Sequence, residues 1–259
     1  MMPDSGQLSG LRVLVPRPSP QGDKLVEEIR RIGAEALHFP VVKTVPPESH
    51  EGLDQALLDI ERFGMVIMVS VAAARSVLTR MRSLGLNLPL STLVCSVGPV
   101  TSQVLRDCGI RVDIEPENEF TSEGLLESLR HIELSGKHIA IFRGQEGREK
   151  LTRDLEKAGA TVLPVMSYRR QITDRPFDEV IQAWKSRGFD VVIITSHNIL
   201  DALLELLGSK HSHLIETTRV LAISPRIANY CRQNKVHNVS VCAPGTASVC
   251  ESLKQFTRT

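Results

Sequence analysis

The chain has 259 residues, of which 42% are hydrophobic and 24% are charged, and its 31 Lys and Arg residues nearly balance its 30 Asp and Glu residues. This composition is typical of a folded globular protein with room for two domains, and it excludes disordered, collagen-like and coiled-coil chains. Aromatic residues make up only 4% and the net charge is +1, so the chain lacks the cationic field and stacking side chains of a dedicated nucleic-acid binder. We expect no nucleic-acid partner.

The first seven residues show no basic segment followed by an apolar one, so we expect no secretory signal. No apolar run approaches the roughly 18 residues of a membrane span, and we expect a cytoplasmic protein with no membrane partner. Five cysteines occur without C-x-x-C or zinc spacing, which indicates reduced and mostly buried thiols. They are Cys95, Cys108, Cys231, Cys242 and Cys250.

Short apolar segments rich in β-branched residues alternate with segments of helical periodicity, such as 24–32 with Leu25, Ile29 and Ile32 on one face. Strands that are apolar throughout are covered on both faces, as in parallel sheets. We therefore predict an α/β fold of doubly wound parallel sheets. The predicted strands are 13–15, 65–69, 93–95, 139–142, 191–194, 220–223 and 239–242.

An internal repeat relates the two halves of the chain at a constant shift of 126 residues. The matched pairs include Val13 with Ile139, Arg17 with Arg143, Gly33 with Gly159, Ser70 with Ser196, and Pro99 with Pro225. Matches spread over most of the chain at one shift indicate two lobes of the same architecture.

Two extended segments interrupt the alternation at equivalent places, near 35–47 and 161–173. Both follow a helix that ends in glycine, and both carry proline among β-branched residues. Proline is tolerated on edge or isolated strands. We interpret these segments as paired linkers that cross between the two lobes.

Ligands of open parallel sheets bind beyond the carboxyl ends of the strands, where helices begin. Loops there combine Ser, Thr, Gly or Pro with a helix start, and such starts bind carboxylate or phosphate through free backbone N–H groups. Ordinary helix capping explains any single loop equally well, but the set predicts an anion-binding cleft shared by the lobes. The loops are 17–20, 70–72, 96–101, 120–123, 143–148, 195–198, 224–226 and 244–246.

Several other chemistries lack their signatures. The sequence has no phosphate-binding G-x-x-x-x-G-K-[ST] and no G-x-G-x-x-G after the first strand. Its one close histidine pair, His211 and His213, is interpreted as part of a solvated loop, and neither Ser70 nor Ser196 lies in a G-x-S-x-G elbow. We therefore expect no metal, no nucleotide cofactor and no serine hydrolase chemistry.

Tyr168 is one of only two tyrosines and lies in the second extended segment. There we expect it to face the space between the lobes and not a sheet interior. A phenol in that position can donate a proton, and the adjacent arginines can pair with carboxylates. The alternative is an amphipathic tyrosine that only packs at an interface.

Taken together, these motifs resemble the uroporphyrinogen-III synthases of tetrapyrrole biosynthesis. The resemblance covers about residues 11–255 and depends on the order and spacing of several short segments. They are 13–18 (VLVPRP), 96–101 (SVGPVT), 120–125 (FTSEGL), 142–149 (FRGQEGRE) followed by Gly159, Pro164 and Tyr168, and 191–198 (VVIITSHN).

The resemblance implies a fold that the repeat alone does not specify. The chain would cross twice between two α/β lobes that are joined by a two-stranded β ladder. One lobe would be formed by residues 1–37 and 173–259 and the other by residues 38–172. It also implies a lyase without cofactors that removes water from the linear tetrapyrrole hydroxymethylbilane, closes it, and inverts ring D to give uroporphyrinogen III.

The resemblance also implies roles for individual residues. Tyr168 matches a tyrosine that the family places beside its cleft, and it is the candidate acid for the departing hydroxyl. The eight carboxylates of the bilane would be spread over arginines and helix starts. The implied substrate-binding residues are Arg17, Ser70, Gly98, Thr101, Arg143, Gly144, Arg148, Thr195, Ser196 and Ser224.

Two departures from the family pattern affect these loops. The Thr-Ser pattern occurs at Thr195-Ser196, whereas the first half has Val69-Ser70, and the late Gly-Pro-Thr loop reads Ser224-Pro225-Arg226. We therefore expect these loops to act mainly through main-chain N–H groups. The resemblance further implies a monomer that makes transient contact with hydroxymethylbilane synthase.

Two alternatives from other classes compete with the synthase. A noncatalytic two-lobe protein that binds an anionic small molecule would be indicated by a secretory signal or a fused regulatory segment. A phosphosugar or nucleotide transferase would be indicated by a phosphate-binding glycine motif or a metal-binding carboxylate pair. The sequence shows none of these features.

Overall fold

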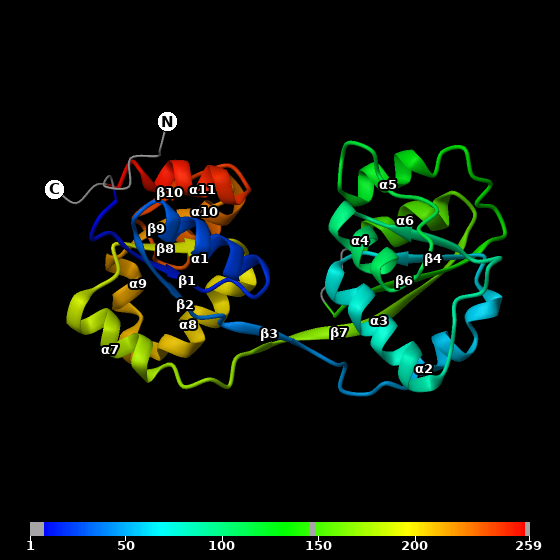
Figure 1. The fold of residues 1–259 in the computed structure, drawn as a ribbon, viewed down its shortest axis with the longest axis horizontal. Helices are drawn as coiled ribbons and strands as arrows, with labels where there is room; N and C mark the ends of the chain where they lie inside the picture. The colour runs from blue at the N-terminus through cyan, green and yellow to red at the C-terminus, as the bar shows by residue number, and fades with distance from the viewer. Residues whose placement is uncertain (1–7, 146–148, 257–259) are drawn as a thin grey trace. The chain divides into compact units, whose positions relative to one another are not determined.

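Parallel strands and helices alternate along the chain in two separate units, which Figure 1 shows as ribbons. The computed structural model describes residues 8–145 and 149–256. Unit 1 comprises residues 1–43 and 171–259, and unit 2 comprises residues 44–170. The chain passes from one unit to the other within the strands β3 (Val42–Val45) and β7 (Thr161–Ile172).

Unit 1 is built on a parallel sheet with the strand order β10-β9-β8-β1-β2. Its strands are β1 (Arg12–Val15), β2 (Glu35–His38), β8 (Val191–Ile194), β9 (Arg219–Ala222) and β10 (Val239–Val241). Its helices are α1 (Gln21–Arg31), α7 (Asp178–Arg187), α8 (His197–His211), α9 (His213–Thr217), α10 (Pro225–Gln233) and α11 (Thr246–Leu253).

Alternating residues of the central strands serve two hydrophobic cores in unit 1. On one face, Val13 and Val15 pack with α1 and α11. On the other face, Leu14 packs in a core with α7, α8 and α10. Because successive side chains of a strand point to opposite faces, a strand covered by helices on both sides must be apolar throughout.

Unit 2 repeats this plan on a sheet with the strand order β3-β7-β6-β4-β5. Beside β3 and β7, its strands are β4 (Met65–Met68), β5 (Leu93–Ser96) and β6 (His138–Gly144). Its helices are α2 (Glu51–Leu58), the 3₁₀ turn η1 (Ile60–Arg62), α3 (Val71–Leu84), α4 (Pro99–Asp107), α5 (Ser122–Ser128) and α6 (Lys150–Lys157). One core lies between the sheet and α2, α3 and α4, and the other lies between the sheet and α5 and α6.

The predicted repeat is confirmed element by element. The strand β6 begins at His138 and β1 at Arg12, which are 126 residues apart, and the pairs β4 and β8, β5 and β9, and α4 and α10 begin at the same separation. The predicted fold class, α/β with two parallel sheets joined by strands, is confirmed as well. Of the first extended segment, β2 pairs with β1, whereas β3 lies beside β7.

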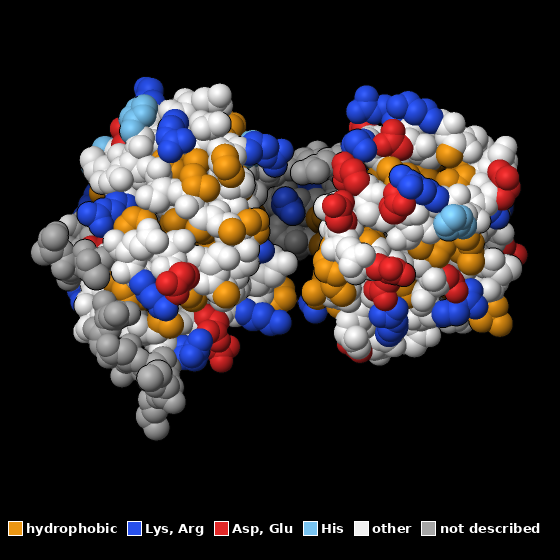
Figure 2. Space-filling model, turned by 90° about the horizontal axis from the view of Figure 1, so that it is seen from above, with side chains coloured by type: hydrophobic (Ala, Val, Ile, Leu, Met, Phe, Trp, Pro, Cys, Tyr) orange, Lys and Arg blue, Asp and Glu red, His pale blue; other side chains and the backbone are white. Residues whose placement is uncertain are grey.

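On the face that Figure 2 shows, both units carry acidic and basic side chains among polar and apolar ones. Among the residues that the structure describes, no helix combines the length and the apolar character needed to cross a lipid bilayer.

Candidate functional site

Three predicted site residues from different elements of unit 2 come together around one phenol. Ser70 Oγ, at the start of α3, donates a hydrogen bond of 3.3 Å to the hydroxyl of Tyr168 on β7. Gly144, at the end of β6, lies under the ring, because a Cβ atom built there would come within 2.7 Å of Tyr168 Cζ. The missing side chain of Gly144 is therefore what makes room for the tyrosine.

Tyr168 is more buried than we predicted from the sequence. Its exposed fraction is 8%, and it packs in the core beside α2 and α3. The expectation that it avoids a sheet interior is therefore wrong. The reason is a shift in the pairing of β6 with β7 between Arg143 and Gly144, which places Tyr168 opposite Gly144. A hydroxyl that accepts one hydrogen bond can still donate its own proton, so this buried phenol keeps its capacity as an acid.

The predicted serines act first as helix caps. Ser70, Ser196 and Ser224 each accept a hydrogen bond from the backbone N–H three residues ahead, at 3.2, 3.3 and 3.3 Å. Each hydroxyl can still donate a proton, because an N-cap serine uses its oxygen as an acceptor. Thr195 directly precedes the cap of α8 and is partly exposed.

The loop after β5 lacks such a cap. Gly98 is the N-cap residue of α4, with extended backbone angles and no side-chain hydrogen bond. Thr101, three residues ahead, is 5% exposed, and its N–H lies 2.9 Å from the Gly98 carbonyl oxygen. Val100 in the first turn is 66% exposed. The first turn of α4 therefore exposes the side chain of Val100 and buries that of Thr101.

The predicted arginines lie in different surroundings. Arg17 in unit 1 follows β1 and donates to Gln21 Oε1 at 2.7 Å, and partial burial lowers the pKa of its guanidinium from the ordinary value. Arg143 lies near the end of β6, where its carbonyl oxygen accepts a hydrogen bond of 3.2 Å from Ser167. Arg148 lies outside the described residues.

The four buried thiols are poor nucleophiles. All five cysteines are free, and four of them are buried, as the spacing predicted. Burial raises the pKa of Cys95 to about 12 and that of Cys231 to about 11, and a thiol is reactive only as the thiolate. Within residues 8–145 and 149–256, no group of three His, Cys, Asp or Glu side chains is placed to hold a metal ion.

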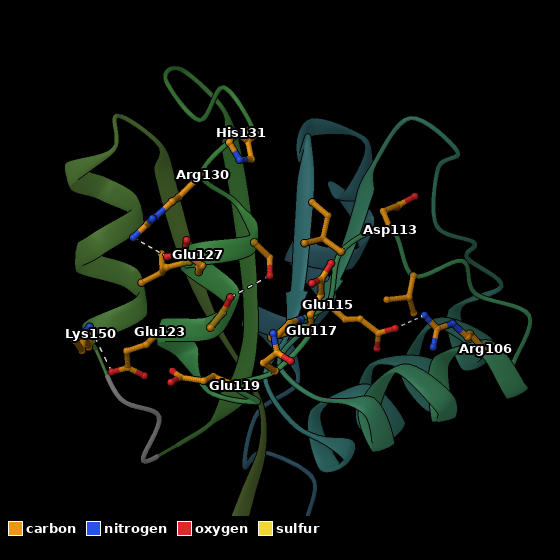
Figure 3. A pocket seen from close by; sticks show the side chains of 17 residues that line it. Arg106, Asp113, Glu115, Glu117, Glu119, Glu123, Glu127, Arg130, His131 and Lys150 are labelled. Carbon is orange, nitrogen blue, oxygen red and sulfur yellow. Dashed lines mark hydrogen bonds and ion pairs between the residues drawn. The ribbon is translucent and has the colours of Figure 1, made fainter.

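A groove of about 1140 Å³ in unit 2 lies outside this set of predicted residues. Figure 3 shows that acidic side chains dominate its lining, and they include Glu115, Glu117 and Glu119. Arg106, Arg130 and Lys150 also line it, and each makes an ion pair with a carboxylate there. A groove of this charge would repel an anionic ligand, so it does not serve as the anion-binding site.

Comparison with known proteins decides the family. The family model described as uroporphyrinogen-III synthase HemD matches residues 23–248. The chain belongs to the uroporphyrinogen-III synthase family. The resemblance that the motifs indicated is therefore confirmed, and with it the prediction of an enzyme of the lyase type.

Individual members of the synthase family are similar to this chain over most of their length. A relative from Methanothermobacter thermautotrophicus that carries the family's name is 31% identical over 236 residues, which are 89% of this chain and 91% of the relative. Uroporphyrinogen-III synthase of Escherichia coli is 26% identical over 86% of this chain and 91% of its own. The crystal structure of the Helicobacter pylori synthetase matches the fold with a TM-score of 0.61 at 16% identity, over 95% of this chain and 98% of that one.

Two residues that contact predicted site residues were not predicted individually from the sequence. The aromatic side chain of Phe120 is 53% exposed and lies beside the Gly98 turn, where a Cβ atom on Gly98 would be 3.6 Å from Phe120 Cβ. His38 of β2 faces the Arg17 carbonyl oxygen at 2.8 Å and Asp23 at 3.0 Å, so it holds the loop that carries Arg17. The sequence could have indicated Phe120, because it is an aromatic residue within a predicted binding loop. No sequence pattern indicated His38.

Proposed function

We propose that this protein converts hydroxymethylbilane to uroporphyrinogen III, and that Tyr168 supplies the proton for the departing hydroxyl. The observation that carries the assignment of Tyr168 is its environment. The phenol is fixed by Ser70 on one side and by the backbone of Gly144 beneath its ring. A general acid must be held within hydrogen-bond reach of the oxygen that it protonates, and these contacts fix the position of the phenol.

The proposed reaction needs only the substrate and the phenol of Tyr168 to balance its atoms, protons and electrons. The phenolic proton passes to the hydroxyl oxygen as the C–O bond breaks, and water leaves while the pyrrole nitrogen donates its electrons to form an azafulvene. The substituted carbon of ring D then attacks the exocyclic carbon to form a spiro-pyrrolenine. The bond from this ring-D carbon to the methylene of ring C breaks, which leaves an azafulvene on ring C, and the unsubstituted α-carbon of ring D then bonds to that methylene, so that ring D is inverted. Loss of a proton restores the pyrrole and returns that proton to the phenolate.

Binding of the bilane in this proposal depends on cations and backbone N–H groups. Arg17 and Arg143 offer cations, and the first turns after Ser70, Gly98, Ser196 and Ser224 offer main-chain donors. The positive end of the helix dipole favours a carboxylate at each of these helix starts. We assign Arg148 to the same set from the family motif alone. The exposed face of Phe120 beside Gly98 is suited to a pyrrole ring.

We further propose that the enzyme acts as a cytoplasmic monomer without a cofactor and receives its substrate by transient contact with hydroxymethylbilane synthase. The family assignment supports a linear tetrapyrrole as the substrate. Light scattering of the purified protein at micromolar concentration tests the monomer. Sedimentation of a mixture with hydroxymethylbilane synthase, with and without substrate, tests the contact.

The decisive experiment supplies freshly made hydroxymethylbilane and separates the product isomers by chromatography after oxidation. Without enzyme, the bilane closes to the type I isomer. We expect the type III isomer to replace type I in proportion to enzyme concentration. A mixture that stays type I at every enzyme concentration would refute the proposed function.

A further inference from the structure

The repeat allows a comparison between two loops that have the same place in the two units. The loop from Ser96 to Thr101 after β5 corresponds to the loop from Ala222 to Ile227 after β9, 126 residues later. In unit 1, Ser224 caps α10 with its side chain. In unit 2 the same position is Gly98, which has no side chain for a cap. The turn that begins α4 must therefore be held in another way.

A chain of buried hydroxyls lies directly beneath the Gly98 turn. Ser96 and Ser102 are fully buried, and their Oγ atoms are 2.6 Å apart. Ser102 donates to Glu115, whose other carboxylate oxygen accepts from Arg106 at 2.7 Å. Because a carboxylate only accepts, the donors run from Ser96 to Ser102 to Glu115. The charged end of this chain lies in the groove of Figure 3, where Glu115 and Arg106 are labelled.

Ser102 links this chain to the turn itself. Its backbone N–H donates to the Gly98 carbonyl oxygen at 3.1 Å, while its side chain is held by Glu115. The bridge between Cys95 of β5 and Ile114 brings the neighbouring Glu115 to this place. Ser102 therefore connects the Gly98 turn to the carboxylate of Glu115.

The fold does not require these hydroxyls. At the repeat-related positions unit 1 has Ala222 and Ala228, both fully buried and packed in an apolar core. A buried hydroxyl costs free energy unless it is hydrogen-bonded. Unit 2 thus has hydrogen-bonded hydroxyls at the positions where unit 1 has the methyl groups of two alanines. Unit 2 is also the unit in which glycine replaces the serine cap.

We propose that Glu115, acting through Ser102 and Ser96, is a positioning residue that holds the Gly98 turn in the conformation that receives a carboxylate of the bilane. The inference rests on the proposed function, in which this turn binds substrate. Without a side-chain cap, the N–H groups of Thr101 and Ser102 both donate to the Gly98 carbonyl oxygen, at 2.9 and 3.1 Å. Val100 carries the remaining first-turn N–H, because Pro99 has none. The anchor beneath Gly98 therefore fixes the carbonyl on which the conformation of the turn, and with it the position of the Val100 N–H, depends.

The first test is the kinetics of Glu115→Gln, with Glu117→Gln in the same groove as the matched control. We expect Glu115→Gln to raise KM for hydroxymethylbilane about tenfold and to change kcat less than about twofold, because binding geometry and not proton transfer is disturbed. Glu117→Gln should leave both constants unchanged. Equal KM values for wild type and Glu115→Gln would overturn the inference.

The second test separates positioning from stability. The double variant Ser96→Ala/Ser102→Ala copies the residues of unit 1, and adding Gly98→Ser completes the copy. The space at Gly98 accepts a Cβ atom, with Phe120 Cβ at 3.6 Å. We expect the added serine to restore the Tm that the double variant loses, while KM stays raised. If KM returns to the wild-type value together with Tm, the hydroxyl chain serves stability alone and the inference is wrong.

These outcomes are distinct from failure of the proposed function. If wild type does not produce the type III isomer, the function is wrong and the inference falls with it. If wild type produces type III and Tyr168→Phe slows it, but KM of Glu115→Gln equals that of wild type, then only the role of Glu115 is refuted.

Discussion

Replacing Tyr168 by phenylalanine removes one oxygen atom from the centre of the proposed site. The ring that fills the core and covers Gly144 is retained, and the 3.3 Å hydrogen bond from Ser70 is lost. A single hydrogen bond of this kind contributes about 1 kcal/mol, which for a unit of this size corresponds to a few degrees in Tm. Loss of a general acid costs about 100-fold in rate or more, which is roughly 2.7 kcal/mol in the barrier.

The assay measures kcat with fresh hydroxymethylbilane and Tm for the same preparations. We expect kcat of Tyr168→Phe to fall about 100-fold with a Tm loss of only a few degrees, and the type I isomer to increase as spontaneous closure competes. Tyr230→Phe is the matched control, because it removes a 2.8 Å hydrogen bond to Asp201 at the other tyrosine of the chain. A kcat of Tyr168→Phe within about threefold of wild type would assign the phenol to packing and refute the reasoning.

Three further predictions address the neighbouring residues. Gly144→Ala should lower kcat at least tenfold, because its Cβ atom would lie 2.7 Å from the tyrosine ring, and normal kinetics would show that the ring moves without consequence. Arg17→Ala should raise KM several-fold, and KM of this variant should increase less steeply with salt concentration than KM of wild type, because a contact with a substrate carboxylate is lost. An unchanged KM at low salt would exclude Arg17 from binding. Glu115→Gln should lower Tm at neutral pH. Hydrogen bonds from Ser102 and then Arg106 hold the pKa of Glu115 below its ordinary 4.5, so this stabilisation is present above that pH and is lost as pH falls through the folded-state pKa. The Tm difference should therefore close in acid, and a constant difference in thermal unfolding across pH would contradict this.

The sequence was sufficient for the fold class and the repeat because both depend on local patterns. Continuous apolar strands such as Val191–Ile194 must be covered on both faces, and the structure places them at the centre of a parallel sheet. Helix capping is the alternative interpretation of the serines before helical segments, and the side chains of Ser70, Ser196 and Ser224 do cap their helices.

The surroundings of Tyr168 and Glu115 could not be predicted, because they depend on pairing between distant segments. The burial of Tyr168 follows from an irregular register between β6 and β7, and alternation along one strand contains no information about its neighbour. Glu115 lies outside the helices and strands, in a segment that Ile114 joins to β5 through a single bridge. Its contact with the buried Ser102 therefore has no local signature.

The most direct test of the central claim is a map of product binding on the backbone. Titration of labelled protein with uroporphyrin III, the oxidised product, is followed through the amide signals of unit 2 by nuclear magnetic resonance. We predict that the largest shifts occur at Val71 and Gln145, which directly follow Ser70 and Gly144, and at Val100, two residues after Gly98. All three lie beyond the carboxyl ends of strands. Shifts confined to the groove around Glu117 and Glu119, with these three amides unmoved, would contradict the account.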